Sequence, residues 1–521
     1  MIRKITNIIF GIVLIANTII TNAQNKMGNI WVVGGRLALT AEFNGIARPT
    51  IQIKYDSLGA GFPYYFASSG SNICDSASGK LLFMSNAMKI WDSTGTVIHN
   101  GDSLQPFNAY THNNPALLGQ TQGSLILPKG MNGQYYVFVP TVSDTTYNIY
   151  WTGASGLPKA PFDMLYVNVV DMQANGGLGS VIVKNKKLLH DTELIKVGMQ
   201  ACKHANGRDW WLVKQGGYYK NEFIKYLVTK DSIYGPYTQT FAEPALEYFD
   251  LNGQIAFSPD GKKFASAISK NRQFFLADFD RCSGEFSNPQ VKYVPLDSTT
   301  IPNPLPQYII DSGMNGVCFS PNGNYLYITR RYNIYQYEYG ESDSSLAWVR
   351  IQHGPDTTYN KFQYYGHLYR GPDDRIYIGN EGGTAKQFSV LDYPNSKGLA
   401  CGFCRKCFRL DTSAYFGITA PPNMPDYTLG ADMSKVCWPL SSQQYEVDNE
   451  QVVVWPNPTA GKLYIKYEIA SQSLANTKKE LYNSVGQLVL STKENEIDVS
   501  GLVSGVYYLR CGVNTKKVIV E

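Results

Sequence analysis

The chain has 521 residues and a formal net charge of +4, with 17% charged residues, 37 tyrosines and 47 glycines. This length exceeds what one small core can bury and implies several domains or a repeat. The low charge and the aromatic, glycine-rich composition are typical of an extracellular β-protein. Lysine and arginine form no stripe with interleaved aromatics, so nucleic acid is not expected as a partner.

Residues 1–23 have the pattern of a secretory signal peptide. Arg3 and Lys4 precede an apolar stretch at residues 8–16, and the small residue Ala23 precedes Gln24. We therefore expect cleavage between Ala23 and Gln24. The apolar stretch is shorter than the roughly 20 residues that a membrane-spanning helix needs, and no other segment is apolar enough, so no transmembrane segment is predicted.

A loose repeat extends over residues 24–440. Its clearest copies are residues 255–265, 317–328 and 368–378, where a strand pattern, a turn with Pro and Asp or Asn, and a second strand pattern follow one another. Each copy predicts two adjacent antiparallel strands joined by a tight turn. Weaker copies bring the number to six, with turn residues at positions 79, 133, 207, 261, 323 and 374.

Repeats of about 40 to 50 residues with four strands are typical of β-propeller blades. The longer intervals predict loop insertions, such as residues 297–307. Strand-like runs flank the six copies on both sides. We expect these runs to supply a seventh blade that joins both ends of the chain, because a closed ring leaves no exposed edges. A tandem of β-sandwiches would not explain the recurring turn.

The densest chemical cluster is Cys401, Cys404 and Cys407, with Cys437 further along. Four thiolates at such spacings could hold zinc tetrahedrally. Basic residues lie between the cysteines, however, and an exported protein folds where disulfides persist. The sequence favours a disulfide among these four that pins the ring closure, and it predicts neither a metal nor a cofactor. The total of nine cysteines is odd, so at least one has no partner within the chain.

His204 and Asp209, beside Trp210 and Trp211, could form a catalytic corner. The sequence favours a blade corner instead, in which the histidine bonds a neighbouring strand and the indoles pack between sheets. Carboxylate pairs at 373–374 and 278/280 could serve acid–base chemistry, but their turn-like contexts favour hydrogen bonding within turns. Without a recognisable catalytic motif, no catalytic residue is predicted.

Residues 452–521 consist of short β-branched and aromatic runs broken by turns, which predicts a small β-sandwich. A polar linker, residues 441–451, precedes it. Pro456, Asn457 and Pro458 follow the first strand pattern, and Gly505 and Tyr507 open a later one.

The order of these pieces resembles the C-terminal sorting domain of the type IX secretion pathway, which carries cargo across the outer membrane of certain Gram-negative bacteria. The Pro456-to-Pro458 entry, the turn at 486–487, the strand from Gly505 through Tyr507 and the basic tail occur in the same order. The resemblance implies that the secretion machinery binds the tail. It also implies that the protein is secreted or anchored on the outer-membrane surface.

Residues 29–437 resemble the WD/YVTN-like propellers that often carry this tail, on segments such as 73–83, 204–211 and 422–427. That group has no common assigned activity. The expected architecture is all-β: a seven-bladed β-propeller over residues 24–440, then a C-terminal β-sandwich sorting domain over 452–521.

Two functions compete for the propeller. The first is non-enzymatic binding of a protein or glycan on the ring face, where loops converge; the second is hydrolysis of polysaccharide or peptide at the central channel. A role in assembling an envelope or motility complex is a third. Clustered carboxylates or histidines at the channel mouth would favour the hydrolase, and an aromatic, uncharged mouth would favour binding.

Overall fold

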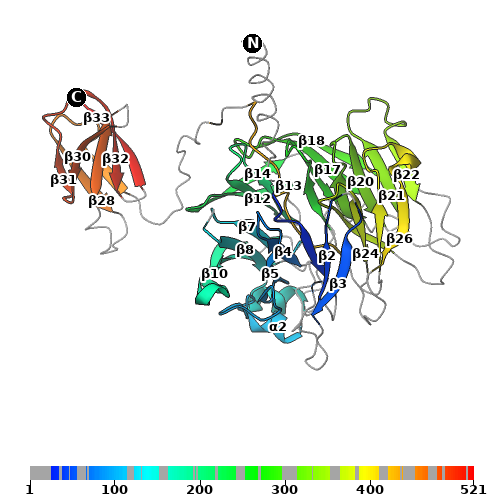
Figure 1. The fold of residues 1–521 in the computed structure, drawn as a ribbon. Helices are drawn as coiled ribbons and strands as arrows, with labels where there is room; N and C mark the ends of the chain where they lie inside the picture. The colour runs from blue at the N-terminus through cyan, green and yellow to red at the C-terminus, as the bar shows by residue number, and fades with distance from the viewer. Residues whose placement is uncertain are drawn as a thin grey trace, which may run out of the picture. The chain divides into compact units, whose positions relative to one another are not determined.

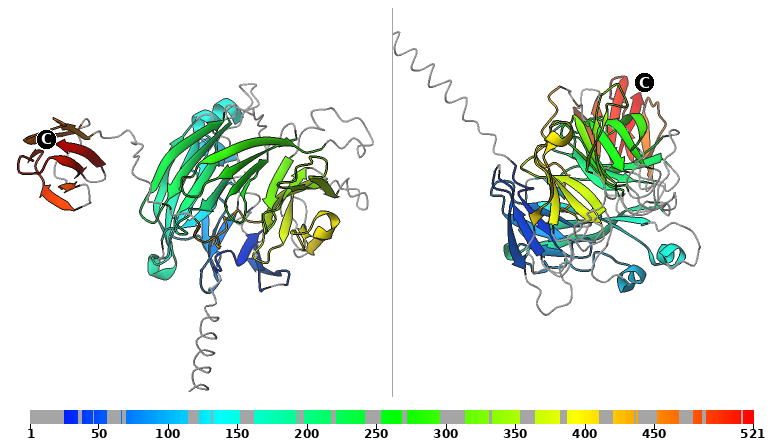
Figure 2. Two further views of the ribbon diagram at one scale, coloured as in Figure 1. Left: turned by 90° about the horizontal axis from the view of Figure 1, so that it is seen from above. Right: turned by 90° about the vertical axis from the view of Figure 1, so that its right-hand side faces the viewer.

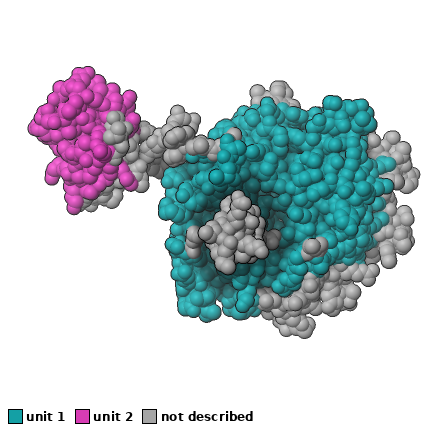
Figure 3. Space-filling view, turned by 45° about the horizontal axis from the view of Figure 1, so that its top comes forward, with its two compact units in different colours: residues 1–440 teal, residues 441–521 magenta. Residues whose placement is uncertain are grey.

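The computed structural model divides the chain into two compact units, residues 1–440 and residues 441–521 (Figure 3). It describes residues 25–34, 38–45, 47–55, 66, 70–113, 122–130, 132–151, 162–191, 194, 198–216, 221–241, 253–267, 272–295, 314–330, 333–352, 364–381, 387–409, 420–434, 437, 452–467, 478–483, 487–511 and 514–521. The predicted signal peptide, its cleavage site at Ala23 and Gln24, the insertion at 297–307 and the linker at 441–451 lie outside these described residues.

The described part of unit 1 contains seven antiparallel sheets, each built from strands consecutive in sequence (Figure 1). We number them blades 1 to 7 in chain order. Blade 1 comprises β1 (Ile30–Val33), β2 (Ala38–Glu42) and β3 (Thr50–Tyr55); blade 2 comprises β4 (Ser71–Cys74), β5 (Leu81–Ser85) and β6 (Ile90–Asp92). Blade 3 comprises β7 (Leu125–Pro128), β8 (Gln134–Thr141), β9 (Met164–Asp171) and β10 (Ser180–His190). Blade 4 comprises β11 (Met199–Lys203), β12 (Trp210–Gln215), β13 (Asn221–Val228) and β14 (Ile233–Phe241).

Blades 5 to 7 have four strands each. Blade 5 comprises β15 (Ile255–Phe257), β16 (Lys263–Ala267), β17 (Gln273–Phe279) and β18 (Phe286–Tyr293). Blade 6 comprises β19 (Met314–Phe319), β20 (Tyr325–Arg330), β21 (Asn333–Glu338) and β22 (Trp348–Gln352). Blade 7 comprises β23 (Tyr364–Arg370), β24 (Ile376–Glu381), β25 (Gln387–Leu391) and β26 (Phe403–Arg409). Short helical turns are α2 (Asn108–Asn113), α3 (Asp144–Thr146), η1 (Tyr147–Trp151), η2 (Asn175–Gly177) and η4 (Gly398–Cys401). Seven sheets are consistent with the predicted blade count.

The blades form a closed ring. The first strands of successive blades contact one another; for example, β1 contacts β4, and β15 contacts β19. The first strands therefore line the central channel. Apolar clusters join blades 1 and 2, blades 2 to 4, and then each later pair in turn. A last cluster joins blade 7 to blade 1, and the two lie side by side in Figures 1 and 2. Strands inside a blade are covered on both faces, so they carry continuous apolar runs rather than an alternating pattern.

Blades 1 and 7 close the ring through side chains. The Trp31 ring contacts the Tyr377 ring, with centroids 5.2 Å apart. Arg48 binds the Asp392 carboxylate at 2.6 Å, and Arg375 binds the same carboxylate at 2.9 Å. The expectation that one blade would combine strands from both chain ends is wrong for the described residues, because blade 1 is wholly N-terminal and blade 7 wholly β23 to β26. Aromatic packing and the ion pairs hold the ends together instead.

The six predicted turns all join the first strand of a blade to its second. Their turn residues have positive φ: Gly79 (75°), Gly133 (68°), Gly207 (72°), Gly261 (71°), Gly323 (74°) and Asp374 (60°). Glycine suits this left-handed conformation because it has no Cβ, and aspartate tolerates it. The predicted pairs of antiparallel strands are therefore confirmed in blades 2 to 7.

Unit 2 is a sandwich of two sheets. One has the order β27 (Val452–Trp455), β28 (Lys462–Tyr467), β31 (Glu496–Asp498); the other has the order β30 (Leu488–Thr492), β29 (Lys479–Asn483), β32 (Gly505–Cys511), β33 (Asn514–Val520). Both sheets contribute to one buried core, which includes Leu463 and Ile497 from the first and Leu481 and Leu509 from the second. The all-β fold class predicted for both units is confirmed.

Candidate functional site

A cavity of about 800 Å³ lies at one mouth of the central channel of unit 1. Its wall is formed by the first strands of blades 4 to 7 with their following turns, by segments near Trp31 and Phe43 of blade 1, and by residues 422–430. We call residues 420–434 the channel segment. Among the described lining residues, the charged side chains are Lys26, Glu42, Lys203, Arg370, Asp374 and Asp426, and none is a histidine.

Asn423 anchors the channel segment in the middle of the ring. Its side chain is fully buried. Its amide nitrogen donates to the carbonyls of Ser124 (3.0 Å) and Met199 (3.1 Å), and its amide oxygen accepts from Gln122 (3.3 Å) and Gln200 (3.0 Å). Because every polar atom of this side chain is bonded, one residue ties the first strands of blades 3 and 4 to the channel segment.

Tyr427 continues the same attachment toward the mouth. Its buried hydroxyl donates to the Ile126 carbonyl at 2.8 Å. Its own carbonyl accepts from the side chains of Asn25 (2.9 Å) and Lys203 (3.2 Å). The Lys203 ammonium also lies 4.9 Å from the Trp210 ring centroid, and burial lowers the pKa of Lys203. The channel segment is therefore attached to the first strands of blades 3 and 4, and it forms part of the cavity wall.

Buried glutamine side chains cross the channel between the first strands of different blades. Gln122 donates to the Ile255 carbonyl and accepts from the Ile255 N–H, at 2.9 and 3.0 Å. Gln254 makes the same pair of bonds with Leu368, at 2.6 and 3.0 Å. These amides satisfy first-strand backbone groups that no neighbouring strand can reach.

The mouth carries charges of both signs from separate elements. Glu42 ends β2, Asp374 lies in the first turn of blade 7, and Asp426 lies in the channel segment. Arg370 binds the Asp426 carboxylate. The carboxylates are thus dispersed around the mouth rather than clustered.

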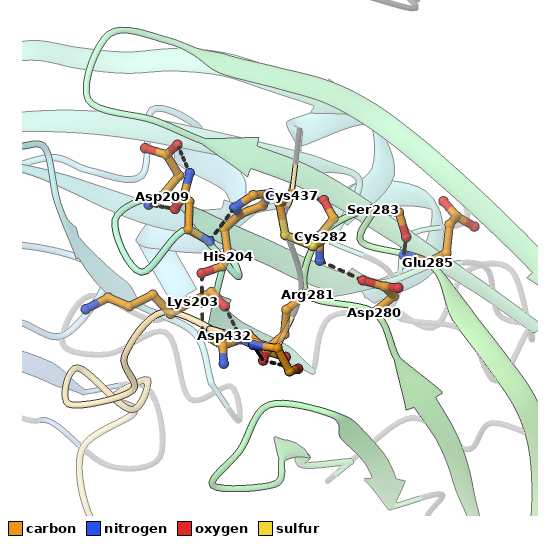
Figure 4. Close-up of a disulfide and its surroundings, with 12 residues drawn as sticks. Lys203, His204, Asp209, Asp280, Arg281, Cys282, Ser283, Glu285, Asp432 and Cys437 are labelled. Atoms are coloured by element: carbon orange, nitrogen blue, oxygen red, sulfur yellow. Dashed lines mark hydrogen bonds between the residues drawn. A yellow bond between two sulfur atoms is a disulfide. The ribbon is translucent and has the colours of Figure 1, made fainter. Parts of the chain in front are cut away.

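Arg281 fastens the outer end of the channel segment. Its buried guanidinium donates to the carbonyls of Lys203 (2.8 Å), Asp260 (3.3 Å) and His204 (3.4 Å), and also to that of Gly430. Figure 4 shows this group beside the disulfide. One cation therefore joins turns of blades 4 and 5 to the channel segment.

The cysteine pairing agrees with the prediction only in part. Cys437 forms a disulfide with Cys282, in the turn between β17 and β18, and not with the 401–407 cluster. Cys404 pairs with Cys407 across two residues, and Cys401 is a buried free thiol. The channel segment brings Cys437 to blade 5, far in sequence from its partner, which sequence spacing could not reveal. This disulfide ties Cys437, just beyond the channel segment, to blade 5 and does not join blades 1 and 7.

The blade-corner interpretation of His204 agrees with the structure (Figure 4). Its Nε2 lies 3.0 Å from the Cys282 carbonyl of the next blade, and its Nδ1 accepts from the Asn206 N–H. Asp209 accepts from Asn206 and Arg208. The indoles of Trp210 and Trp211 are buried. Both ring nitrogens of His204 and both carboxylate oxygens of Asp209 therefore have structural hydrogen-bond partners. Burial lowers the pKa of His204.

A buried histidine predicts how stability depends on pH. Burial in β23 lowers the pKa of His367 to about 4, below the ordinary value of about 6.5. The unfolded chain therefore binds the extra proton first, so stability is complete above pH 6.5 and falls as the pH drops toward 4. We expect roughly 3 kcal/mol of this loss to disappear in His367→Gln. Urea unfolding at pH 7.5 and 4.5 measures it, with exposed His112→Gln as the control; equal pH dependence in both variants would contradict the assignment.

The predicted sorting-motif residues lie together in unit 2. Pro456 and Pro458 are exposed and flank Asn457. The Asn457 side chain donates to the Lys517 carbonyl (2.7 Å) and accepts from the Ile519 N–H (2.8 Å), so it binds the edge of β33. Gly505 begins β32, and the buried Tyr507 donates its hydroxyl to the Val503 carbonyl. Their role in sorting stays a prediction.

The most important residues of the cavity are not predicted from the sequence. Gln122, Gln200 and Gln254 belong to no motif, since an amide that caps a strand edge leaves no spacing signature. Part of the channel segment, residues 422–427, stands out in the sequence, but only as one of the segments that resemble WD/YVTN-like propellers, and its place in the channel is not predicted. Among the described residues, no helix is long and apolar enough to cross a bilayer, and no three His, Cys, Asp or Glu side chains converge as metal ligands.

Known proteins resemble the chain in two ways, through a family model that matches unit 2 and through solved structures with a similar fold. Residues 453–521 match the family model for the secretion system C-terminal sorting domain. Among solved structures, the chain is similar to the Dos1 propeller at 10% identity and a TM-score of 0.42, over 74% of this chain and 86% of that one. It is also similar to hydrazine synthase from Kuenenia stuttgartiensis, at 14% identity and a TM-score of 0.37, over 73% and 94% of the respective chains.

A search of curated proteins found no match. The sorting-domain match covers unit 2, and the ring of sheets defines unit 1. The chain therefore carries a C-terminal sorting domain of the type IX secretion system after a β-propeller.

Proposed function

We propose that the propeller is a non-enzymatic binding module, displayed or released outside the cell, whose ligand site is the channel-mouth cavity. The observation that carries this proposal is the composition of the wall. Aromatic rings, prolines, amides and strand edges form most of it, and its carboxylates come from three separate elements. A size of about 800 Å³ is within the range of ligand pockets, about 300–1,000 Å³.

Hydrolysis of a polysaccharide or peptide is the competing function. A glycosidase needs two carboxylates facing one bond. At this mouth Asp426 is bound by Arg370, and the histidine of the nearby corner bonds backbone groups on both ring nitrogens. These contacts support binding rather than acid–base chemistry.

Blocking the cavity tests the proposal. Thr428 is exposed and lines the cavity, whereas Met433 is exposed on the same segment outside it. With the chain from Gln24 onward on glycan and peptide arrays, we expect Thr428→Trp to weaken binding at least tenfold and Met433→Trp to leave it unchanged. Equal binding by both variants, or cleavage of the bound probe, would contradict the proposal.

A further inference from the structure

The first strands of a propeller have one edge paired within the blade and one edge facing the channel. Along an antiparallel strand, the N–H and C=O of alternate residues point to opposite edges. Groups on the channel edge need another partner, because buried backbone groups are rarely left unbonded. Their partners differ around this ring.

On blades 3 and 4 the channel segment supplies the partners. Asn423 donates to Ser124 and Met199, and Tyr427 donates to Ile126, so successive channel-facing carbonyls are occupied. A proline-containing piece of polypeptide is thus held against the first strands by its side chains.

On blade 5 the edge is only half occupied. Ser258 donates its N–H to Lys263 of the second strand, and Ala267 donates to Gln254, so residues 254, 256 and 258 face β16. Ile255 faces the channel, where Gln122 bonds both of its backbone groups. Phe257 is two residues nearer the mouth and faces the same way. No hydrogen bond to its N–H or C=O is found within the described residues.

Blade 6 repeats the pattern. Ser320 donates its N–H to Tyr325 of the second strand, so Phe319 faces the channel. Its carbonyl accepts only a weak bond from the Cys318 thiol, at 3.5 Å, and among described residues its N–H has no acceptor. Phe257 and Phe319 both line the cavity. The cavity therefore faces two neighbouring strand edges that offer unpaired peptide groups.

We propose that the cavity binds an extended polypeptide segment whose main chain pairs with the channel edges at Phe257 and Phe319. This inference rests on the proposed function and names its ligand class. A peptide offers alternating donors and acceptors at strand spacing, which is how peptides add to exposed sheet edges. The mouth has three cationic and three anionic side chains, which favours a segment without net charge. The channel segment shows that polypeptide already lies against first strands of this ring, where side chains of Asn423 and Tyr427 hold it.

Backbone N-methylation provides the direct test, because it removes one N–H while keeping the side chain. Peptides selected from a random-sequence library on the chain from Gln24 onward are each resynthesised with a single N-methyl group, moved along the sequence. We expect at least a tenfold rise in Kd at one or two alternate positions and little change at the others. Thr428→Trp should abolish binding of the parent peptide, and Met433→Trp should preserve it.

The outcomes separate the two proposals. Glycan binding that Thr428→Trp removes, without peptide binding, would overturn the peptide inference and leave the binding function intact. Peptide binding that is insensitive to every N-methyl group would also overturn it, since side chains alone would then carry recognition. Peptide binding that Thr428→Trp does not affect would place the site elsewhere and overturn both.

Discussion

Replacing Cys437 with serine is expected to lower the free energy of unfolding of the propeller by roughly 4–5 kcal/mol. The Cys282–Cys437 disulfide joins residues separated by 155 positions, and cross-linking so long a loop removes much conformational entropy from the unfolded chain. It also holds the end of the channel segment, where Arg281 binds Gly430. Guanidinium unfolding monitored by tryptophan fluorescence gives the value.

The second disulfide provides the control. Cys404 and Cys407 are three positions apart, so their bond encloses almost no chain, and Cys404→Ser should cost far less than Cys437→Ser. Peptide mapping without reduction should recover a fragment that joins residues 282 and 437. Equal losses in the two variants, or a fragment that joins Cys437 to the 401–407 cluster, would refute the assignment.

Changing Asn423 to aspartate should be the most damaging isosteric substitution in the channel. The carboxylate keeps the acceptors for Gln122 and Gln200 but loses the donor that binds the Ser124 and Met199 carbonyls. Two buried carbonyls would then face a buried negative charge. Each lost bond leaves an unsatisfied group at a cost of about 1–3 kcal/mol, so we expect a loss of about 3 kcal/mol or more in unfolding free energy at pH 7.

The same variant has a diagnostic pH dependence. Burial beside carbonyls should raise the folded-state pKa of the new carboxyl group above its unfolded value. The variant is then least stable at high pH and recovers as the pH falls through that raised pKa, relative to the native chain. Asn44→Asp, at the exposed rim of the same cavity, is the matched control and should change unfolding little. A pH-independent deficit in Asn423→Asp would show that burial of a negative charge is not its cause.

The turns were predictable from the sequence because their chemistry is local. Proline, aspartate and glycine restrict the backbone within four residues, and all six predicted turn residues have a positive φ. The alternation of turn and strand was enough to indicate a ring of blades. The sorting domain was equally accessible, since its short motifs lie in one sandwich.

The site was less predictable because it depends on contacts across the ring. Gln122 bonds Ile255, and Gln254 bonds Leu368, over separations of 133 and 114 residues. Cys437 meets Cys282 only because the channel segment returns to blade 5. Cys401, Cys404 and Cys407, which are close in sequence, do lie together in η4 and β26 of blade 7, whereas Cys437 pairs with blade 5. The sequence therefore indicates contacts between near neighbours but does not indicate which distant segments the fold brings together.

The position of the Cys282–Cys437 bond also governs how the propeller responds to force. Any pull on the chain beyond residue 437 reaches blade 5 through a covalent cross-link before it reaches Asn423 or Tyr427. Tension on the sorting domain during export would thus bypass the channel segment, and a cut after residue 437 would leave it fastened at both ends. The disulfide therefore transmits force from the C-terminal unit to blade 5 and lowers the load on the channel segment, which forms part of the cavity wall.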